Sequence, residues 1–217
     1  MAETRYQAHQ VPVKDRDVRL YSYIVARDFG FAPNPFYGIC TLATCKPKIR
    51  ATARPGDWIV GTGSKGFRLD GHIVFAMRVT EVLTFDQYWS DTRFKRKRPN
   101  LRGSLKQAYG DNIYHRHPQT GDWLQEDSHH SYADGSSNPA NVERDTQSDA
   151  VLIGEEFYYW GKSGPKIPNQ FRNYNGLDVC LSGPGHKCNF PHVLAGLFVH
   201  WIRSQVDHGY LGEPAEF

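Results

Sequence analysis

Several stretches of the chain place apolar residues in the pattern of buried β-strands. In residues 72–82, large apolar side chains occupy alternate positions, which is the two-residue period of a strand. A Pro-Gly-Asp turn precedes a second strand at 58–63, which starts apolar and ends in a glycine-rich exit. β-Branched and aromatic residues at 19–26 predict another strand, central in its sheet. A further strand is expected at 150–154, followed at 155–161 by a turn that carries four consecutive rings.

The end of the chain has a helical pattern instead. Between Pro191 and Asp207, apolar residues recur every three or four positions and form one stripe along a helix. Pro191 suits the first helical turn, and Gly209 suits the C-terminal cap. Such a stripe is typical of core packing, so we expect a C-terminal amphipathic helix that binds no cofactor. Shorter helical segments are expected at the end of 39–53 and within 83–93.

Residues 94–149 are mostly polar and offer little apolar material for a core. A polar stretch of this length in a compact chain is usually a functional insertion or a disordered loop. The Trp, Tyr and His residues scattered through it favour order, because disordered segments avoid aromatic residues. We therefore expect a flexible leader at residues 1–18, then a single domain at 19–217 with a polar insertion at about 94–149.

Composition places the chain among globular proteins. Hydrophobic residues make up 39% and charged residues 23% of its 217 positions. Apolar runs stay well short of the roughly 20 residues that cross a bilayer, and the first residues lack the apolar core of a signal peptide. We expect a cytoplasmic protein with no membrane contact. The net charge of +3 is too small to establish a polyanionic partner by itself.

The four cysteines form no CxxC pair and are expected to be free thiols. A zinc site drawn from Cys180, His186, Cys188 and His192 matches no standard spacing, so no metal site is expected. The sequence also lacks a Walker A string, a GxGxxG after a strand and the zinc-deaminase signature. ATP hydrolysis, nicotinamide redox chemistry and zinc deamination thus lose their main support, and no cofactor is expected.

Aromatic residues are unusually frequent, at 13% of the chain, with 12 Phe, 12 Tyr and 5 Trp. Together with 20 Gly and 13 Pro, they favour a loop-rich fold that contains strands over a helical bundle. A nucleobase needs rings above and below it and polar groups at its edge. The alternative role for each ring is core packing. The candidates for base binding are Asn34, Phe36, Trp89, Asn112, Tyr114 and Trp123.

Cations concentrate in one segment despite the small net charge. Five of them lie within residues 94–102, and Lys106 follows. Because the run adjoins Pro99, we expect an exposed loop, which is either a solvated surface or a contact for phosphate. A second group lies just before the Pro-Gly-Asp turn. The candidates for phosphate binding are Lys46, Lys48, Arg96, Arg98 and Arg102.

Carboxylates and imidazoles gather at three places that could support acid–base chemistry. One is the end of the first strand, and the others lie within 111–115 and 127–130, where the residues could form a general base with an orienting partner or, alternatively, a divalent metal site. In an extended segment, Asp127 and His129 share one side, while the intervening Ser128 and the following His130 point away. A serine nucleophile is not expected, because the Gly-x-Ser-x-Gly elbow is missing there. The catalytic candidates are Asp28, Asp111, His115, Asp127 and His129.

Residues 54–61 (RPGDWIVG) and 71–82 (GHIVFAMRVTEV) resemble the PUA-like barrels, a group that includes the EVE, ASCH and YTH domains. The chain as a whole resembles the second family of nucleotide-modification-associated domains, bacterial and phage proteins predicted to act with DNA base modification. That likeness rests on segments between residues 20 and 161, among them YSYIVARDFGFAPNPFYGICTLATCKPKIR, GDWIVGTGS, FDQYWSDTRF, KRPNLRGS, GDNIYH, WLQEDSHHS and AVLIGEEFYYWG. The PUA-like resemblance implies a small, strongly curved β-barrel with a few helices, in which EVE and YTH relatives hold a modified base between aromatic rings.

We expect an α+β protein built on a PUA-like curved β-barrel. Its expected function is binding of a nucleotide or nucleic acid, DNA included, and recognition of a modified base in a bacterial or phage DNA-modification or defence context. One alternative is a nucleotide-directed enzyme, a hydrolase or transferase that uses the Asp and His candidates. Another is a structural subunit of a modification complex, in which the basic run would be a docking surface for protein partners.

Overall fold

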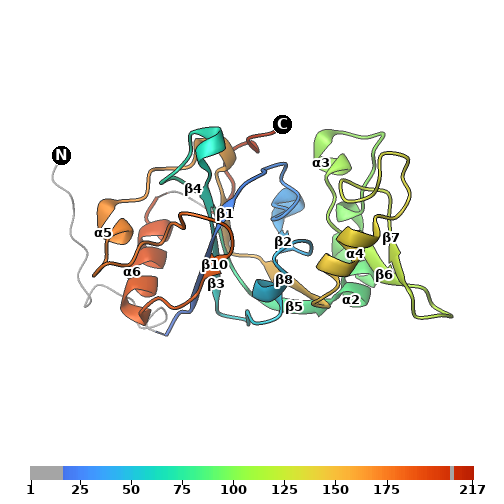
Figure 1. Ribbon diagram of the computed structural model, residues 1–217, viewed down its shortest axis with the longest axis horizontal. Helices are drawn as coiled ribbons and strands as arrows, with labels where there is room; N and C mark the ends of the chain where they lie inside the picture. The colour runs from blue at the N-terminus through green and yellow to red at the C-terminus, as the bar shows by residue number, and fades with distance from the viewer. Residues whose placement is uncertain (1–16, 206–207) are drawn as a thin grey trace. The chain divides into compact units, whose positions relative to one another are not determined.

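The computed structural model describes residues 17–205 and 208–217, and its chain forms two compact units (Figure 1). Within the described residues, unit 1 holds 17–27, 56–78 and 156–215, and unit 2 holds 28–55, 79–155 and 216–217. Each unit is therefore assembled from distant segments of the sequence. The single domain stays a prediction. Of the predicted leader, residues 1–16 lie outside the described residues, and Val18 is buried.

Unit 1 is built on a six-stranded sheet in the order β10, β1, β3, β4, β9, β11. The bounds are β1 Leu20–Val25, β3 Trp58–Gly63, β4 Ile73–Arg78, β9 Phe157–Tyr159, β10 His186–Lys187 and β11 Gly209–Tyr210. β1 runs parallel to β3 and β9 parallel to β11, while the other neighbours are antiparallel. The strands predicted at 19–26 and 58–63 are confirmed.

The glycine-rich end of β3 has a steric cause. Its register against β4 shifts between Gly61 and Thr62. A Cβ atom at Gly61 would lie 2.3 Å from the Phe75 ring and 2.5 Å from the Val25 side chain. Glycine at this position therefore lets the neighbouring strands pack closely around β3.

One helix supplies much of the apolar cover of this sheet. The residues of α6 (His192–Arg203) that are buried, among them Leu194 and Phe198, pack in one cluster with Leu20 and Trp58 of the sheet. Figure 1 shows α6 beside the strands, near the short helix α5 (Asn169–Arg172). The predicted C-terminal helix is confirmed, but it ends at Arg203 with Ser204 as its C-cap, and Gly209, the predicted cap, lies in β11. Two 3₁₀ turns, Lys65–Phe67 and Gly161–Ser163, complete the helical elements of unit 1 among the described residues.

Unit 2 contains a three-stranded antiparallel sheet and a separate hairpin. The sheet has the order β2 (Cys40–Leu42), β8 (Ala150–Gly154), β5 (Glu81–Thr84), and the hairpin pairs β6 (Tyr114–Arg116) with β7 (Trp123–Gln125). Its helices are α1 Pro47–Arg50, α2 Phe85–Ser90, α3 Leu105–Ala108 and α4 Pro139–Asp145, with 3₁₀ turns at Phe36–Gly38 and Thr92–Lys97. The strand predicted at 150–154 and the short helices in 39–53 and 83–93 are confirmed.

The long strand predicted at 72–82 is wrong in one respect. β4 ends at Arg78 and β5 begins at Glu81, so the chain makes two strands in place of one. β4 pairs with β9 in unit 1, whereas β5 pairs with β8 in unit 2. The apolar alternation runs on through Val79, past the end of β4, so the two-residue period could not locate the break.

The four rings at 157–160 do not form the turn that the sequence predicts. Phe157, Tyr158 and Tyr159 are the three residues of β9, and each is at most 5% exposed. Consecutive rings alternate between the two faces of a strand. All four rings are therefore core residues of unit 1 and none is displayed for a ligand.

The polar insertion is an ordered part of unit 2. Phe94, Ile113 and Tyr114 are fully buried and pack in one cluster with Phe85 and Val151. Polar residues of the insertion, including Asp111, Asn112 and Asp145, are buried too. Hydrogen-bonded polar side chains thus replace part of the apolar core, which is why the composition of 94–149 did not indicate a folded core.

The α+β class is confirmed, whereas the expected curved barrel is not observed. The strands of the described residues form three separate sheets, and none of these closes. The sheet of unit 1 ends on two-residue strands, β10 and β11, which do not pair with each other. Among the helices that the structure describes, none combines the length and the apolar character needed to cross a membrane.

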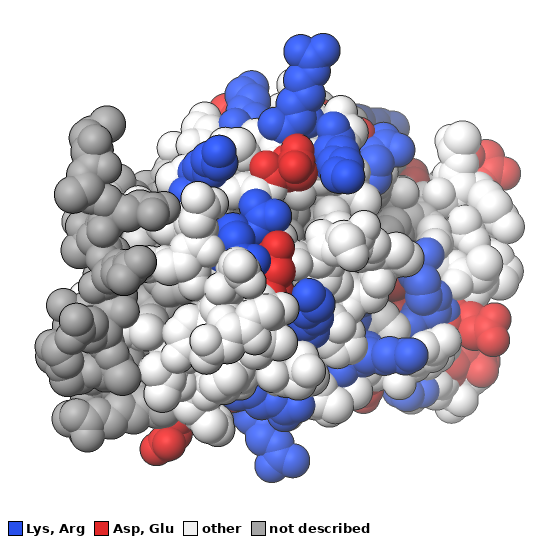
Figure 2. Space-filling model, turned by 60° about the vertical axis from the view of Figure 1, so that its left-hand side comes forward, with Lys and Arg blue, Asp and Glu red and all other residues white. Residues whose placement is uncertain are grey.

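The charged surface agrees with the small net charge. On the face that Figure 2 shows, Lys and Arg side chains lie in separate groups among uncharged and acidic residues. A broad, continuous basic surface is the usual footprint of a protein that binds duplex DNA through its phosphates. The face in Figure 2 shows no such surface.

A capping box fixes the start of α2. The Thr84 hydroxyl accepts the Gln87 N–H at 3.2 Å, and the Gln87 side-chain oxygen accepts the Thr84 N–H at 2.8 Å. We expect Thr84→Ala to lower the free energy of unfolding by about 1 kcal/mol, and Thr84→Ser to keep most of it. Urea unfolding of the three proteins measures both effects, and equal losses in the two variants would exclude the cap as the cause.

Candidate functional site

Trp89 reaches the surface of unit 2 because of its place on α2. Phe85 and Tyr88 occupy the buried face of this helix and are fully buried. Trp89 follows at the edge of that face and is half-buried. Of the rings predicted to bind a base, this one borders a pocket together with charged residues.

Two side chains hold the Trp89 indole. The His115 ring of β6 stacks on it, with ring centroids 4.1 Å apart and an interplanar angle of 14°. The Arg98 guanidinium carbon lies 3.7 Å from the centroid of the indole, and its Nη2 donates to the Trp89 carbonyl at 2.5 Å. His115 is in turn bound to the Glu126 carboxylate, with Nε2 and Oε1 2.9 Å apart. Trp89 is therefore part of a layered stack and does not offer a bare ring face to a base.

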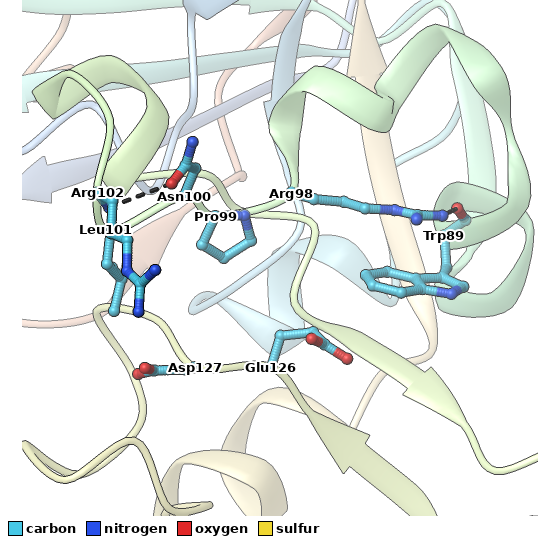
Figure 3. Close-up of a pocket in the computed structure, with 8 residues that line it drawn as sticks. All are labelled: Trp89, Arg98, Pro99, Asn100, Leu101, Arg102, Glu126 and Asp127. Atoms are coloured by element: carbon cyan, nitrogen blue, oxygen red, sulfur yellow. Dashed lines mark hydrogen bonds between the residues drawn. The ribbon is translucent and has the colours of Figure 1, made fainter.

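A pocket of about 480 Å³ opens on the Arg98 side of this stack. Figure 3 shows Arg98 lying over Trp89 on one side of the pocket, with Asp127 and Glu126 across from the 98–102 segment. Arg102 reaches toward the carboxylates, and Pro99 and Leu101 supply apolar surface. Two cations and two carboxylates in one pocket suit a polar ligand that has both acceptors and donors. A second pocket, of about 610 Å³, lies on the His115 side of Trp89.

The phosphate candidates divide among three places. Arg98 and Arg102 line the pocket of Figure 3, whereas the Arg96 guanidinium lies 4.2 Å from the ring centroid of Tyr37. Lys46 and Lys48 belong to the start of α1, where Lys46 is partly buried and Lys48 is exposed. The run at 94–102 is a 3₁₀ turn followed by a loop, and its residues are exposed as expected at 95–96 and 100–102, but not at Phe94 and Lys97.

Lys97, in the middle of this run, is an internal residue. It is 1% exposed, and its Nζ donates to the Asn34 carbonyl at 2.9 Å and to Asn34 Oδ1 at 2.7 Å. Burial lowers the pKa of Lys97 to about 8, although the nearby Asp111 carboxylate acts in the opposite direction. One of the five cations therefore belongs to the core and adds nothing to the surface charge.

Asp111 is buried beside Lys97 and organises a polar network. Its carboxylate accepts the Thr41 hydroxyl at 2.6 Å and the Tyr88 hydroxyl at 2.7 Å. Burial raises the pKa of Asp111, while Lys97 and the two hydroxyls oppose that shift. The side-chain amide of the next residue, Asn112, donates to the carbonyls of Tyr88 at 3.0 Å and Phe94 at 3.4 Å.

This network supports the pocket from behind. The two carbonyls that Asn112 binds belong to α2 and to the 3₁₀ turn that leads to Arg98. Asn34, Asp111 and Asn112 are all fully buried. In this structure the three residues act as the internal framework that fixes Trp89 and Arg98, and a ligand could not reach their side chains without rearrangement.

The other base-binding candidates are engaged in packing. Phe36 is buried and stacks on Phe217, with centroids 5.7 Å apart. The Tyr114 hydroxyl donates to Asp145 at 3.0 Å. Trp123 is half-buried and lies under the Arg116 guanidinium, which is 3.9 Å from its ring centroid.

The catalytic candidates do not converge on one centre. The Asp28 side chain, 4% exposed, accepts the Gly30 N–H at 3.4 Å within its own loop. Asp127 lines the pocket and accepts the Ser131 hydroxyl at 2.9 Å. His129 is exposed and lies against aromatic rings, with Phe29 at a centroid distance of 4.6 Å. Asp127 and His129 are exposed while Ser128 and His130 are buried, as predicted, but residues 127–130 form a turn and not the extended segment that was expected.

Sequence reasoning missed a cluster on the buried side of that alternation. His130 Nδ1 lies 2.7 Å from Asp145 Oδ2, and His130 Nε2 lies 3.8 Å from the Cys45 sulfur. Cys45 and His130 lie 85 positions apart along the chain, and His130 and Asp145 lie 15 positions apart. No local spacing connects them. The only sequence signal was the presence of a cysteine and a histidine outside any disulfide or zinc pattern.

The same three side chains carry the types of donor atom that bind metal ions. Among the residues that the structure describes, Cys45, His130 and Asp145 are the group whose donor atoms all lie within 4.8 Å of one another. His130 gives one ring nitrogen to Asp145, so a metal would be left with the Cys45 sulfur and Nε2, short of the four ligands of a structural zinc site. Arg50 and Arg144 add positive charge beside Cys45. The donor set therefore fits a metal poorly.

Comparison with known proteins identifies a family for this chain. No curated protein and no solved structure is significantly similar to this chain. A protein family described as nucleotide modification associated domain 2 matches residues 17–217, nearly the whole chain. A match of this extent confirms the family resemblance of the sequence segments quoted above. The chain belongs to the nucleotide modification associated domain 2 family.

Proposed function

We propose that unit 2 binds a nucleotide, either free or as a base displaced from a nucleic acid, in the pocket of Figure 3. In this proposal the protein is the recognition component of a bacterial or phage nucleotide-modification system and reads a modified base. The observation that carries it is the Arg98 guanidinium held flat against Trp89 at the wall of a pocket. Family membership supports the nucleotide as the class of ligand.

The Arg98 plane supplies the stacking surface in this proposal. One face of the guanidinium covers the indole, and the bond to the Trp89 carbonyl fixes its orientation. Displaced bases stack on arginine planes as well as on aromatic rings. Because Arg98 is already ordered, the ligand loses little affinity to the ordering of this side chain.

The rest of the pocket offers groups for the other parts of a nucleotide. Arg102, which is exposed at the rim, can meet a phosphate. The Asp127 and Glu126 carboxylates can accept the amino or imino hydrogens at the edge of a base. A volume of about 480 Å³ falls within the range of small-molecule sites.

Binding of nucleoside monophosphates to wild-type protein and to an Arg98→Gln variant tests the proposal. We expect Arg98→Gln to weaken binding roughly tenfold or more, because loss of a stacked base contact costs about 1–3 kcal/mol. Titration calorimetry with the four deoxynucleotides, their ribonucleotide counterparts and a 5-substituted deoxycytidine monophosphate measures affinity and base preference. Arg98→Lys, which keeps the charge without the plane, is expected to bind almost as poorly as Arg98→Gln.

Arg96→Gln is the matched control, because Arg96 lies in the same run but on Tyr37. It is expected to bind like wild type. Equal affinities of Arg98→Gln and wild type, or no measurable affinity for any nucleotide in the panel, would refute the proposal. Single-stranded DNA whose binding falls steeply with salt would extend the contacts to several phosphates.

A further inference from the structure

We propose that Cys45, His130 and Asp145 form a second site with its own chemistry, in which Cys45 is the nucleophile, His130 the acid and base, and Asp145 the orienting carboxylate. The reaction is acyl transfer from an amide or ester through a thioester on Cys45. This activity goes beyond nucleotide recognition and uses none of the residues that line the pocket of Figure 3.

The order of contacts is that of a nucleophile–base–orienter triad. The Cys45 sulfur lies 3.8 Å from His130 Nε2, and the opposite ring nitrogen lies 2.7 Å from Asp145. Triads are recognised by this geometry and not by the order of the residues along the chain. An imidazole that gives Nδ1–H to a carboxylate presents Nε2 to the nucleophile, which is the arrangement found here.

Asp145 is held in place more firmly than a surface carboxylate would be. It is fully buried at the end of α4, and it also accepts from the Tyr114 hydroxyl at 3.0 Å, the Cys45 N–H at 3.0 Å and Arg144 Nε at 3.2 Å. The bond from the Cys45 main chain matters most, because it ties the carboxylate to the nucleophile as well as to the base. The whole group is thereby positioned in advance of any ligand.

Cys45 sits on a turn that displays its side chain. The residue lies between β2 and α1, and both Cys45 and Lys46 have positive φ values, of 56° and 43°. Non-glycine residues adopt this conformation at a cost of order 1–3 kcal/mol each, and such residues cluster at functional sites. A strand that is followed by a strained nucleophile and then by a helix is also the arrangement of a nucleophile elbow. Cys45 is partly exposed, whereas Cys40 is fully buried, with a pKa that burial raises to about 12.

The hydrogen bonds of His130 favour the protonated form of its ring. Burial by itself would lower the pKa of His130, but its bonds to Asp145 and Cys45 outweigh that effect and raise the pKa to about 9. An imidazolium is the form that protonates a leaving group. The titratable and charged groups around Cys45 and His130 are Asp145, Arg144, Lys46, Arg50, Tyr114 and His129.

The reaction balances with water as the only co-reactant. The Cys45 thiolate attacks the carbonyl carbon, and a carbon–sulfur bond forms. The tetrahedral intermediate collapses with cleavage of the bond to nitrogen or oxygen, and the leaving group takes a proton from His130 Nε2. Water then attacks the thioester while Nε2 accepts its proton, and cleavage of the carbon–sulfur bond releases the acid and restores the thiolate.

Acetylation by p-nitrophenyl acetate tests the site in the full-length protein. Release of p-nitrophenol gives the rate, and peptide mass spectrometry after acid quench locates the acetyl group. We expect a thioester on Cys45 in wild type, none in Cys45→Ser, and acetylation of His130→Asn that is slower by about a hundredfold or more. Circular dichroism and thermal unfolding establish that each variant is folded.

Cys188→Ala is the matched control, because Cys188 is the other partly exposed thiol among the described residues and belongs to unit 1. Its rate is expected to equal that of wild type. Asp145 acts through His130, so Asp145→Asn is followed by NMR titration of the imidazoles, in which His130 is expected to lose its raised pKa.

Three results would overturn the inference. These are the absence of acetyl from Cys45, equal rates in wild type and folded His130→Asn, and a stoichiometric metal ion in the purified protein that Cys45→Ser removes. Nucleotide affinity of Cys45→Ser is expected to match wild type. Failure of the acyl-transfer site and failure of the nucleotide pocket are therefore seen in separate measurements.

Discussion

Replacement of Arg50 by methionine is expected to lower the free energy of unfolding by roughly 4 kcal/mol, because buried main-chain acceptors lose a charged donor. Arg50 is 1% exposed, and its guanidinium donates to four main-chain carbonyls. These belong to Cys45 at 2.8 Å, Ser148 at 2.8 Å, Ala150 at 2.6 Å, and Asp145. Methionine fills much of the volume but leaves buried acceptors without donors, and each bond to a charged group contributes about 1.5–3 kcal/mol.

Urea unfolding of Arg50→Met measures this loss. Lys48→Met is the matched control, because Lys48 lies on the same short helix but is exposed. It is expected to change the free energy of unfolding by less than about 0.5 kcal/mol. A loss below about 1 kcal/mol in Arg50→Met would mean that water or rearranged main chain satisfies the four carbonyls.

The second large effect is a pH dependence of the free energy of unfolding that arises from Lys97. Its pKa is about 8 in the folded protein, against 10.5 for an ordinary lysine, because burial disfavours the charged form. Below pH 8 Lys97 is protonated in both the folded and the unfolded protein, and burial of its charge destabilises the folded state by the full amount. Between 8 and 10.5 the unfolded state binds more protons than the folded state, so the contribution of Lys97 to stability rises with pH.

The size of this effect follows from the pKa difference. It corresponds to roughly 3 kcal/mol gained by wild type relative to Lys97→Met between pH 7 and 10.5. Denaturant unfolding of both proteins at several pH values measures it. Lys95→Met, at an exposed position of the same turn, is the control. Other ionisable groups contribute to the pH dependence of unfolding in both proteins. Parallel profiles of unfolding free energy against pH for wild type and Lys97→Met would therefore contradict the prediction.

The pattern of apolar residues predicted much of the framework. The strands β1, β3 and β8 and the helix α6 were predicted because their burial follows the local period of the sequence. Prediction failed where burial depends on which other strand of the sheet lies alongside. β9 was taken for a turn, and the stretch 72–82 was taken for one strand, because neither pattern shows which strand lies alongside.

The candidate sites divide in the same way. Trp89, Arg98, Arg102 and Asp127 were predicted from residue type, and the structure brings them to one pocket. Lys97 lay in a run of cations that indicated a surface, yet it is buried against Asn34. A charge run cannot reveal burial, because that depends on the carbonyls and carboxylates that other segments supply.

The sequence by itself determined the α+β class, the family, and the residue types available for stacking, phosphate contact and acid–base chemistry. Only the tertiary structure decided which of these residues meet. Cys45, His130 and Asp145 come from three distant segments and approach within hydrogen-bonding range because α4 and the loop before it pack against the β2–α1 turn. Local patterns follow the period of one element, whereas a catalytic or binding geometry follows from packing between elements, and no single segment encodes that packing.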